Sequence, residues 1–189
     1  ARGGVIVYPT DTLYGLGANA LDGWAVSQVF RIKKRELEKP LPMIVRDVSW
    51  AKELAFIAPW HEKIFKKIWP GRVTAILPKR KMVPAELTAG GSTVGIRIPD
   101  YLFTDQLLKK FGYPLTSTSA NISDQEPSND VHDIIRLFSG ERVRPDLIID
   151  AGILPKSEPS TVVDLTTSQP KIIRVGPSKP AELLKLLEL

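Results

Sequence analysis

A short polar run from Thr116 to Asn121 has the residue types of a ligand-binding site. It carries four hydroxyl groups and one side-chain amide, with no charge among them. The preceding residues, Tyr113 to Leu115, predict the end of a buried strand. In α/β proteins, donors that follow the end of a strand are commonly directed at a bound ligand. The alternative is a polar loop that hydrogen-bonds only to itself.

Two further segments carry groups suited to the same kind of site. Residues 9–17 combine hydroxyls with Gly15 and Gly17, whose small size lets the backbone approach a ligand. The cations of residues 33–35 and Lys39 can neutralise a polyphosphate. Part of that cluster also suits the carboxyl end of a predicted helix, where positive charge is favourable.

Arg97 stands in a segment, Gly95 to Pro99, that otherwise predicts a buried strand. A buried arginine requires an anionic partner, so Arg97 either forms a structural ion pair or binds a carboxylate. The sequence has neither of the common glycine-rich phosphate loops. A bound nucleotide would therefore be held by basic side chains and hydroxyls. Residues 159–164 and 172–176 are further polar segments of this kind.

Composition sets the class of the protein. The 189 residues are 43% hydrophobic and 25% charged, which predicts a single globular domain over residues 1–189. The absence of cysteine excludes thiolate catalysis and disulfides. The only histidines, His61 and His132, are expected on helix surfaces, which argues against a zinc site or a Ser-His-Asp triad. The net charge of +5 fits an anionic ligand, and no apolar stretch is long enough to span a membrane.

Strands and helices are predicted to alternate irregularly, with several direct strand-to-strand steps. This order favours a mixed α/β sheet rather than a purely parallel one. Strand alternation within the polar run predicts that Thr116 and Thr118 face away from the site. The predicted strands are 3–9, 42–46, 72–78, 93–99, 113–115, 147–150, 160–165 and 171–175. The predicted helices are 22–35, 47–57, 59–69, 102–111, one that starts at Asp130, and a closing one that starts near Ser178 and Pro180.

Seven motifs occur in order along nearly the whole chain. They are residues 9–16 (PTDTLYGL), Lys33-x-Arg35 with Pro40-Leu41, 69–74 (WPGRVT), 94–99 (VGIRIP), 117–121 (STSAN), 159–164 (PSTVVD) and 173–176 (IRVG). Together they resemble the YrdC-like family of threonylcarbamoyl-AMP synthases. The resemblance implies a YrdC-like fold, which is a single twisted mixed β-sheet with flanking helices and a large concave cavity. The sequence departs from the family pattern at Glu36 and at Asp124-Gln125.

The resemblance also implies a reaction and a set of site residues. L-threonine, bicarbonate and ATP would give threonylcarbamoyl-AMP and pyrophosphate, for the threonylcarbamoyl modification of tRNA. The implied catalytic residues are Lys33, Arg35, Ser119 and Asn121. The implied threonine-binding residues are Thr10, Arg97, Ser117 and Ser160. The implied ATP-binding residues are Lys33, Arg35, Thr93, Ser119, Ser128 and Arg174.

The residue types suit this chemistry because it needs no protein nucleophile. The site must hold two anionic reactants together against their mutual repulsion. Arg97 can form two parallel hydrogen bonds with the threonine carboxylate. A Mg²⁺ ion is expected as cofactor, held mainly by ATP, because no cluster of acidic residues stands out. No metal ligands are assigned in the chain.

The implied function is that of a cytoplasmic enzyme that passes its product to a tRNA-modifying threonylcarbamoyl transferase. One alternative is a module that binds double-stranded RNA or tRNA during RNA maturation without catalysis. Spread-out Lys and Arg with stacking aromatics would favour that reading, whereas here the polar residues cluster in motifs and aromatics make up 7% of the chain. A second alternative, the carbamoyl-transfer domain of hydrogenase-maturation proteins, fits the short length less well.

Overall fold

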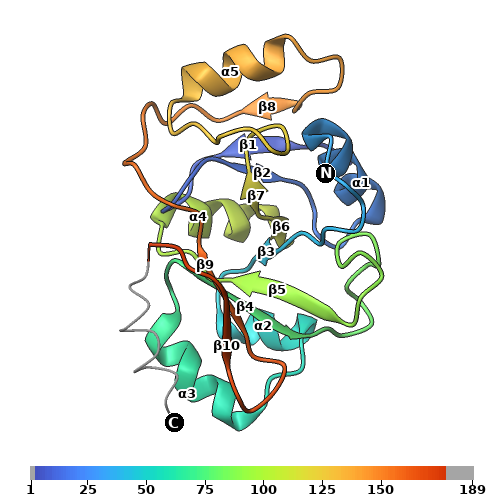
Figure 1. Cartoon of the computed structure of the whole chain (residues 1–189), viewed down its shortest axis with the longest axis vertical. Coiled ribbons are helices and arrows are strands. Elements are labelled where there is room, and N and C mark those ends of the chain that lie inside the picture. The colour runs from blue at the N-terminus through green and yellow to red at the C-terminus, as the bar shows by residue number, and fades with distance from the viewer. Residues whose placement is uncertain (1–2, 178–189) are drawn as a thin grey trace.

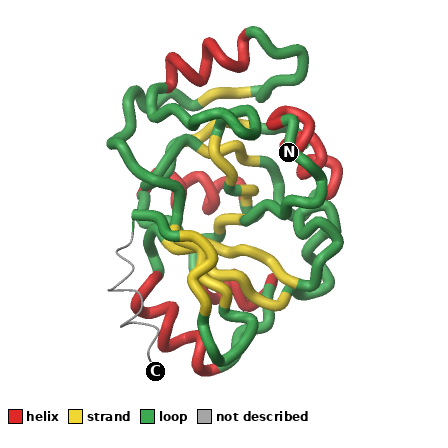
Figure 2. Tube along the Cα trace, in the orientation of Figure 1, coloured by secondary structure: helices red, strands yellow, loops and turns green. Residues whose placement is uncertain are grey.

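The computed structural model describes residues 3–177 (Figure 1). The closing helix predicted near Ser178 and Pro180 lies outside the described residues. The described strands form two sheets, where the sequence predicted one. Figure 2 shows helices at both ends of the long axis and strands between them. Each sheet contains both parallel and antiparallel pairs, as predicted for a mixed α/β fold.

The four-stranded sheet has the order β7-β2-β1-β8. Its strands are short: β1 (Ile6–Tyr8), β2 (Gly15–Gly17), β7 (Thr118–Ser119) and β8 (Leu147–Ile148). β1 and β2 form an antiparallel pair in which Val7 lies opposite Leu16. β1 also pairs with β8 in parallel, and this joins residues that are far apart in the sequence. The residues between β1 and β2 are therefore held at one end of this sheet.

The six-stranded sheet has the order β10-β9-β4-β5-β3-β6. Its long members are β4 (Val73–Pro78) and β5 (Thr93–Arg97), which pair in antiparallel fashion. The remaining strands are β3 (Met43–Ile44), β6 (Leu115–Thr116), β9 (Thr161–Asp164) and β10 (Lys171–Arg174). β-branched residues dominate β9, as expected for a half-buried pleated surface.

The helices begin within one residue of the predicted positions, because local capping residues fix their starts, whereas α1 and α2 end two and three residues earlier than predicted. Asp22, Asp47 and Asp130 accept backbone N–H groups at the starts of α1 (Gly23–Lys33), α2 (Val48–Leu54) and α5 (Val131–Ser139). Pro59 opens α3 (Pro59–Ile68). Gly112, with φ of 76°, ends α4 (Leu102–Phe111) in the left-handed region.

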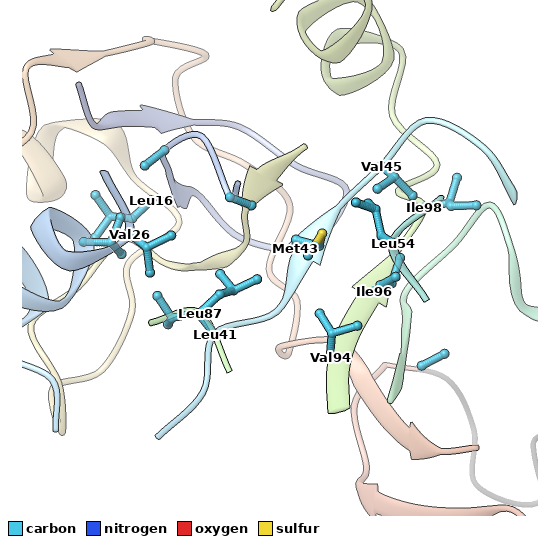
Figure 3. Close-up of a cluster of buried hydrophobic side chains, with 14 of the residues drawn as sticks. Leu16, Val26, Leu41, Met43, Val45, Leu54, Leu87, Val94, Ile96 and Ile98 are labelled. Carbon is cyan, nitrogen blue, oxygen red and sulfur yellow. The ribbon is translucent and has the colours of Figure 1, made fainter. Parts of the chain in front are cut away.

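The hydrophobic core is continuous across the two sheets. In Figure 3, Met43 of β3 lies between a group that contains Leu16 and Val26 and a group that contains Val45 and Ile96. Met43, Leu16 and Ile96 have no exposed surface. Side chains from both sheets therefore pack into one core, and this packing fixes the positions of the strand ends that carry the polar motifs.

His61 is buried, and the prediction that it lies on a helix surface is wrong. Its Nδ1 accepts the N–H of Ala58 at 2.8 Å, and its Nε2 lies 2.8 Å from the carbonyl oxygen of Leu165. The ring thus satisfies two backbone groups at the start of α3 and after β9, which is why a polar ring can be buried there. His132 is exposed at the start of α5, as predicted.

Candidate functional site

The chain passes from one sheet to the other inside the polar run. Thr116 of β6 pairs with Met43 in the six-stranded sheet, whereas Thr118 and Ser119 of β7 pair with Leu16 and Gly15 in the four-stranded sheet. Ser117 lies between them, and its N–H donates to the carbonyl of Pro42 at 2.8 Å. The run therefore connects the two sheets and places its hydroxyls at their junction.

A polar cavity of about 170 Å³ opens at this junction. Among its lining residues are seven that the sequence predicted for the site: Thr10, Arg35, Arg97, Ser117, Ser119, Ser160 and Arg174. The other lining residues are Thr12, Leu13, Tyr14, Gly15, Pro42, Thr118 and Pro159. The lining therefore combines three guanidinium groups with several hydroxyls, and none of the described residues contributes a carboxylate to it.

Lys33 and Asn121 lie directly behind the cavity wall. The Nζ of Lys33 donates to the backbone oxygens of Ser119 and Asn121, at 2.7 and 2.9 Å, and to Oδ1 of Asn121 at 2.7 Å. Asn121 Oδ1 also accepts the hydroxyl of Ser119 at 2.6 Å. All three protons of the ammonium group thus have partners in the turn that follows β7.

Within residues 3–177, no carboxylate lies within hydrogen-bonding distance of Lys33, although only 2% of its surface is exposed. Burial, together with the nearby charge of Arg35, lowers the pKa of Lys33 to about 7. An anion bound in front of Ser119 would compensate this buried charge. The arrangement around Lys33 therefore favours an anionic ligand at this end of the cavity.

Arg97 forms a structural ion pair, which is one of the two alternatives that the sequence left open. It forms a buried ion pair with Asp11 through its Nη2, its Nη1 donates to Thr12 Oγ1 at 3.1 Å, and its Nε donates to the carbonyl of Gly71 at 3.0 Å. A guanidinium has five N–H donors, so these three contacts leave two. Because Arg97 also lines the cavity, those two N–H groups can serve a ligand.

Arg35 and Arg174 are held by backbone oxygens rather than by acids. Arg35 donates to the carbonyls of Lys39 and Pro40 at 3.0 and 3.1 Å. Arg174 donates twice to the carbonyl of Ser160, at 3.1 and 2.8 Å. Carbonyl contacts fix the two side chains without neutralising their charge. Both positive charges therefore remain available to an anionic ligand in the cavity.

Gly176 allows β10 to approach the segment before β9 closely. A side chain at this position would clash with the backbone of Pro159, Ser160 and Thr161. The N–H of Gly176 donates to Thr161 Oγ1 at 3.0 Å. Close packing therefore requires glycine at position 176 of the last motif, and this packing brings Arg174 against Ser160.

The side chains of the two threonines in the polar run face in different directions. Thr116 faces away from the cavity as predicted, and its Oγ1 donates to the carbonyl of Leu16 at 3.0 Å. Thr118 lines the cavity, so its prediction is wrong. The alternation of a single strand does not continue through Ser117, because the chain changes sheets at that residue.

Thr93 and Ser128 lie away from the cavity. Thr93 pairs with Pro78 at the opposite end of β5 from Arg97. Ser128 donates to Asp133 at 2.8 Å and accepts the N–H of Asp130 at 3.0 Å, which stabilises the start of α5. The structure therefore gives both residues local roles, and their predicted contact with ATP stays a prediction.

Three residues near the site were part of a predicted motif without a role of their own. Asp11 and Thr12 hold Arg97. The hydroxyl of Tyr14 donates to the carbonyl of Gly152 at 2.9 Å and accepts the N–H of Ala151 at 3.0 Å. Tyr14 thus ties the loop after β8 to the cavity wall. The polar side chains of these three residues could have indicated a role from the sequence alone. Their partners could not be identified, because they are distant in the sequence.

A larger cavity of about 490 Å³ is lined by Trp69, by residues 98–101 and by part of α4. It contains none of the predicted site residues, and its only cationic lining residue, Arg46, is paired with Asp105. We therefore place the functional site in the smaller cavity. The smaller cavity is less extensive than the large concave one that was predicted.

The described part of the chain holds no group of three or more His, Cys, Asp or Glu side chains that could bind a metal ion. Among the same residues, no helix has the length and apolar character needed to cross a membrane.

The fold and the site are those of an α/β domain with a polar cavity lined by cations and hydroxyls. The chain belongs to the Sua5/YciO/YrdC family, since the model of that family, described as Telomere recombination, matches residues 1–176. This match confirms the family resemblance that the seven motifs predicted.

Curated relatives and a solved structure agree with this assignment. The threonylcarbamoyl-AMP synthase of Pyrococcus abyssi is 35% identical over 187 residues, which are 98% of this chain and 54% of that protein. The threonylcarbamoyl-AMP synthase of Thiobacillus denitrificans is 35% identical over 92% of this chain and 89% of that protein. The crystal structure of P. abyssi Sua5 complexed with L-threonine matches with a TM-score of 0.92 and 34% identity, over 99% of this chain and 54% of that one. The chain thus spans about half the length of the P. abyssi protein.

Proposed function

We propose that the chain is an L-threonylcarbamoyladenylate synthase, a nucleotidyltransferase that uses L-threonine, bicarbonate and ATP. The observation that carries the proposal is the convergence of Arg35, Arg97 and Arg174 on one cavity whose lining has hydroxyls but no carboxylate. Such a site attracts two anionic reactants and holds them side by side. The names of the relatives support an enzyme of this kind.

Threonine would bind in the inner part of the cavity. The two N–H groups that Arg97 has left match the two oxygens of a carboxylate. Ser117 and Ser160 line the same space and can bind the amine and the hydroxyl of the substrate. Thr10 also lines this space, but its hydroxyl already donates to the carbonyl of Leu13 at 2.7 Å and accepts the N–H groups of Thr12 and Leu13 at 3.1 and 3.2 Å. Thr10 would therefore hold the shape of the loop that faces the substrate.

ATP would bind at the mouth, because a cavity of about 170 Å³ is smaller than the roughly 300–1,000 Å³ of typical ligand pockets. Arg35 and Arg174 would contact the phosphates there. Ser119 would face the α-phosphate, with Lys33 and Asn121 supporting it from behind. Mg²⁺ would arrive with ATP, since phosphate oxygens and water supply the ligands it prefers.

The reaction needs two bond-forming steps. The neutral amine of threonine attacks the carbon of bicarbonate. The hydroxyl group of bicarbonate and one proton of the amine leave together as water, and the product is a carbamate. A carbamate oxygen then attacks the α-phosphorus of ATP, and pyrophosphate leaves. The contribution of the protein is to position the reactants and to stabilise charge on the phosphates.

The product is a reactive mixed anhydride, so a transferase that modifies tRNA must consume it. We propose such a transferase as the functional partner. Because ATP and tRNA are both present in the cytoplasm, the proposed activity would operate there. Direct binding of tRNA or double-stranded RNA without catalysis is the alternative to this enzymatic function.

The test is pyrophosphate release by purified protein in the presence of ATP, bicarbonate and Mg²⁺. Release is expected only when L-threonine is added, together with a product of the mass of threonylcarbamoyl-AMP. Release that ignores threonine would contradict the proposal, as would none from a folded sample. In the latter case, binding of double-stranded RNA without turnover would favour the non-catalytic alternative.

A further inference from the structure

A buried ion pair joins Arg97, which lines the cavity, to Asp11 beside it. The side chains of Arg97 and Asp11 are 5% and 7% exposed, and Nη2 of the arginine contacts Oδ1 of the aspartate. Arg97 is the last residue of β5, whereas Asp11 lies between β1 and β2. The pair therefore connects the six-stranded sheet to the four-stranded one at the site itself.

Asp11 is held at both of its oxygens. Oδ1 contacts Arg97, and Oδ2 accepts the N–H of Asp100 at 3.3 Å. The carboxylate therefore cannot turn without losing one of two contacts. A carboxylate fixed in this way limits the orientations that are open to the guanidinium beside it.

The guanidinium is planar, so its contacts define where its other N–H groups point. Nε is fixed by the carbonyl of Gly71, Nη1 by Thr12, and Nη2 by Asp11. Of these three acceptors only Asp11 is charged, and charge-assisted hydrogen bonds are about twice as strong as neutral ones. Asp11 is thus the strongest of the three restraints on Arg97.

We propose that Asp11 is a positioning residue, which fixes the guanidinium plane of Arg97 so that its two remaining N–H groups face the carboxylate of the amino-acid substrate. This inference rests on the proposed function for the identity of that substrate. Asp11 does not touch the substrate. It acts through Arg97 and keeps the arginine from turning toward other acceptors when the cavity is empty.

The test compares Asp11→Asn with Asp100→Asn. The first variant removes the charge that holds Arg97 with little change in size. The second removes the same charge from an exposed side chain in the same corner, and leaves the backbone N–H that Asp11 accepts. The KM for L-threonine is expected to rise about tenfold or more in Asp11→Asn, with the KM for ATP within about twofold. In Asp100→Asn, the KM for L-threonine and the KM for ATP should both stay within about twofold of the wild-type values.

A readout without catalysis separates this inference from the proposed function. In a crystal structure of ligand-free Asp11→Asn, the guanidinium of Arg97 is expected to leave Gly71 or Thr12. If it keeps both contacts, the inference is overturned, whether or not the wild-type protein releases pyrophosphate. Tighter threonine binding by Asp11→Asn would also overturn it, because Asp11 would then be a competitor of the substrate.

A second variant covers the case in which Asp11→Asn does not fold. Thr12→Val removes one acceptor of Arg97 and leaves the charge pair intact. It is expected to raise the KM for L-threonine about two- to fivefold, without changing the KM for ATP. An unchanged KM for both substrates would show that the orientation of Arg97 is not limiting, which overturns the inference.

Discussion

Among the site residues, Lys33 has the most unusual environment. Its ammonium group is buried and contacts three oxygens of Ser119 and Asn121, and no carboxylate of the described part of the chain lies at hydrogen-bonding distance. Burial is therefore the main cause of its pKa near 7, which lies far below the ordinary 10.5. Its charge, and with it the attraction for phosphate, should depend on pH in the physiological range.

The pH dependence of ATP use tests this residue. The charged form of Lys33 is present below pH 7 and is lost as the pH rises through 7. At saturating L-threonine, kcat/KM for ATP is therefore expected to fall above pH 7, approaching about tenfold per pH unit. Lys33→Met should remove this fall and lower the value at pH 6. Lys81→Met, at an exposed position, is the control that should keep it.

Stability should change in the opposite direction. In the unfolded chain Lys33 keeps its ordinary pKa of 10.5, so between pH 7 and 10.5 the unfolded state binds more protons than the folded state. Unfolding free energy therefore rises with pH over this window. Denaturant titrations of the wild type and of Lys33→Met would show it. A fall of stability with pH that is specific to Lys33 would contradict the burial argument.

Among the elements, α3 and the end of β9 are joined by one side chain. His61 links the N–H of Ala58 to the carbonyl of Leu165, and its ring stacks on Phe65 with centroids 5.9 Å apart. The link lies outside the cavity, so it should affect stability and not the reaction.

The two histidines provide a matched pair for measuring this link. His61→Leu leaves two backbone groups without partners, at a cost of about 1–3 kcal/mol for each such group. We expect a total loss of about 2–6 kcal/mol in the free energy of unfolding. His132→Leu, at an exposed position, should change it by less than about 0.5 kcal/mol. Equal losses in urea titrations of the two variants would contradict the structural role of His61.

Elements whose boundaries depend on local chemistry could be predicted from the sequence. The caps Asp22, Asp47 and Asp130 mark helix starts, and Gly112 marks a helix end. β2 was missed because its three residues, Gly-Leu-Gly, have low strand propensity, and pairing with β1 and β7 overrides it. The division into two sheets was missed because it depends on which distant strands pair with β6 and β7.

In the candidate site too, features that depend on local chemistry could be predicted, whereas contacts between distant segments could not. Residues that carry motif chemistry, such as Arg35, Ser119 and Ser160, reach the cavity as predicted. What could not be predicted is the pairing between motifs. Asp11 meets Arg97 only because β1 and β5 are brought together by the shared core. The burial of His61 was hidden for the same reason, since its partner Leu165 is far away in sequence.

At the scale of the whole molecule, the cavity is shared between the two sheets, so a ligand should stabilise both. L-threonine at about 100 times its Kd is expected to add about 2.7 kcal/mol to the unfolding free energy. Hydrogen exchange should slow in β7 and β9 together. The methyl ester of L-threonine, which lacks the carboxylate, should have a much smaller effect. Protection confined to one sheet would contradict a shared site.

The pairing of β1 with β8 has a consequence for synthesis of the chain. Ile6 lies beside Leu147, so one edge of β1 has no partner until about 140 further residues have been made. At ribosomal rates of about 5–20 residues per second, that wait is roughly 7–30 seconds. During this time the nascent chain exposes an unpaired apolar strand, which is a hazard for aggregation. Slowed translation should therefore reduce the yield of folded protein more than a small increase in temperature does.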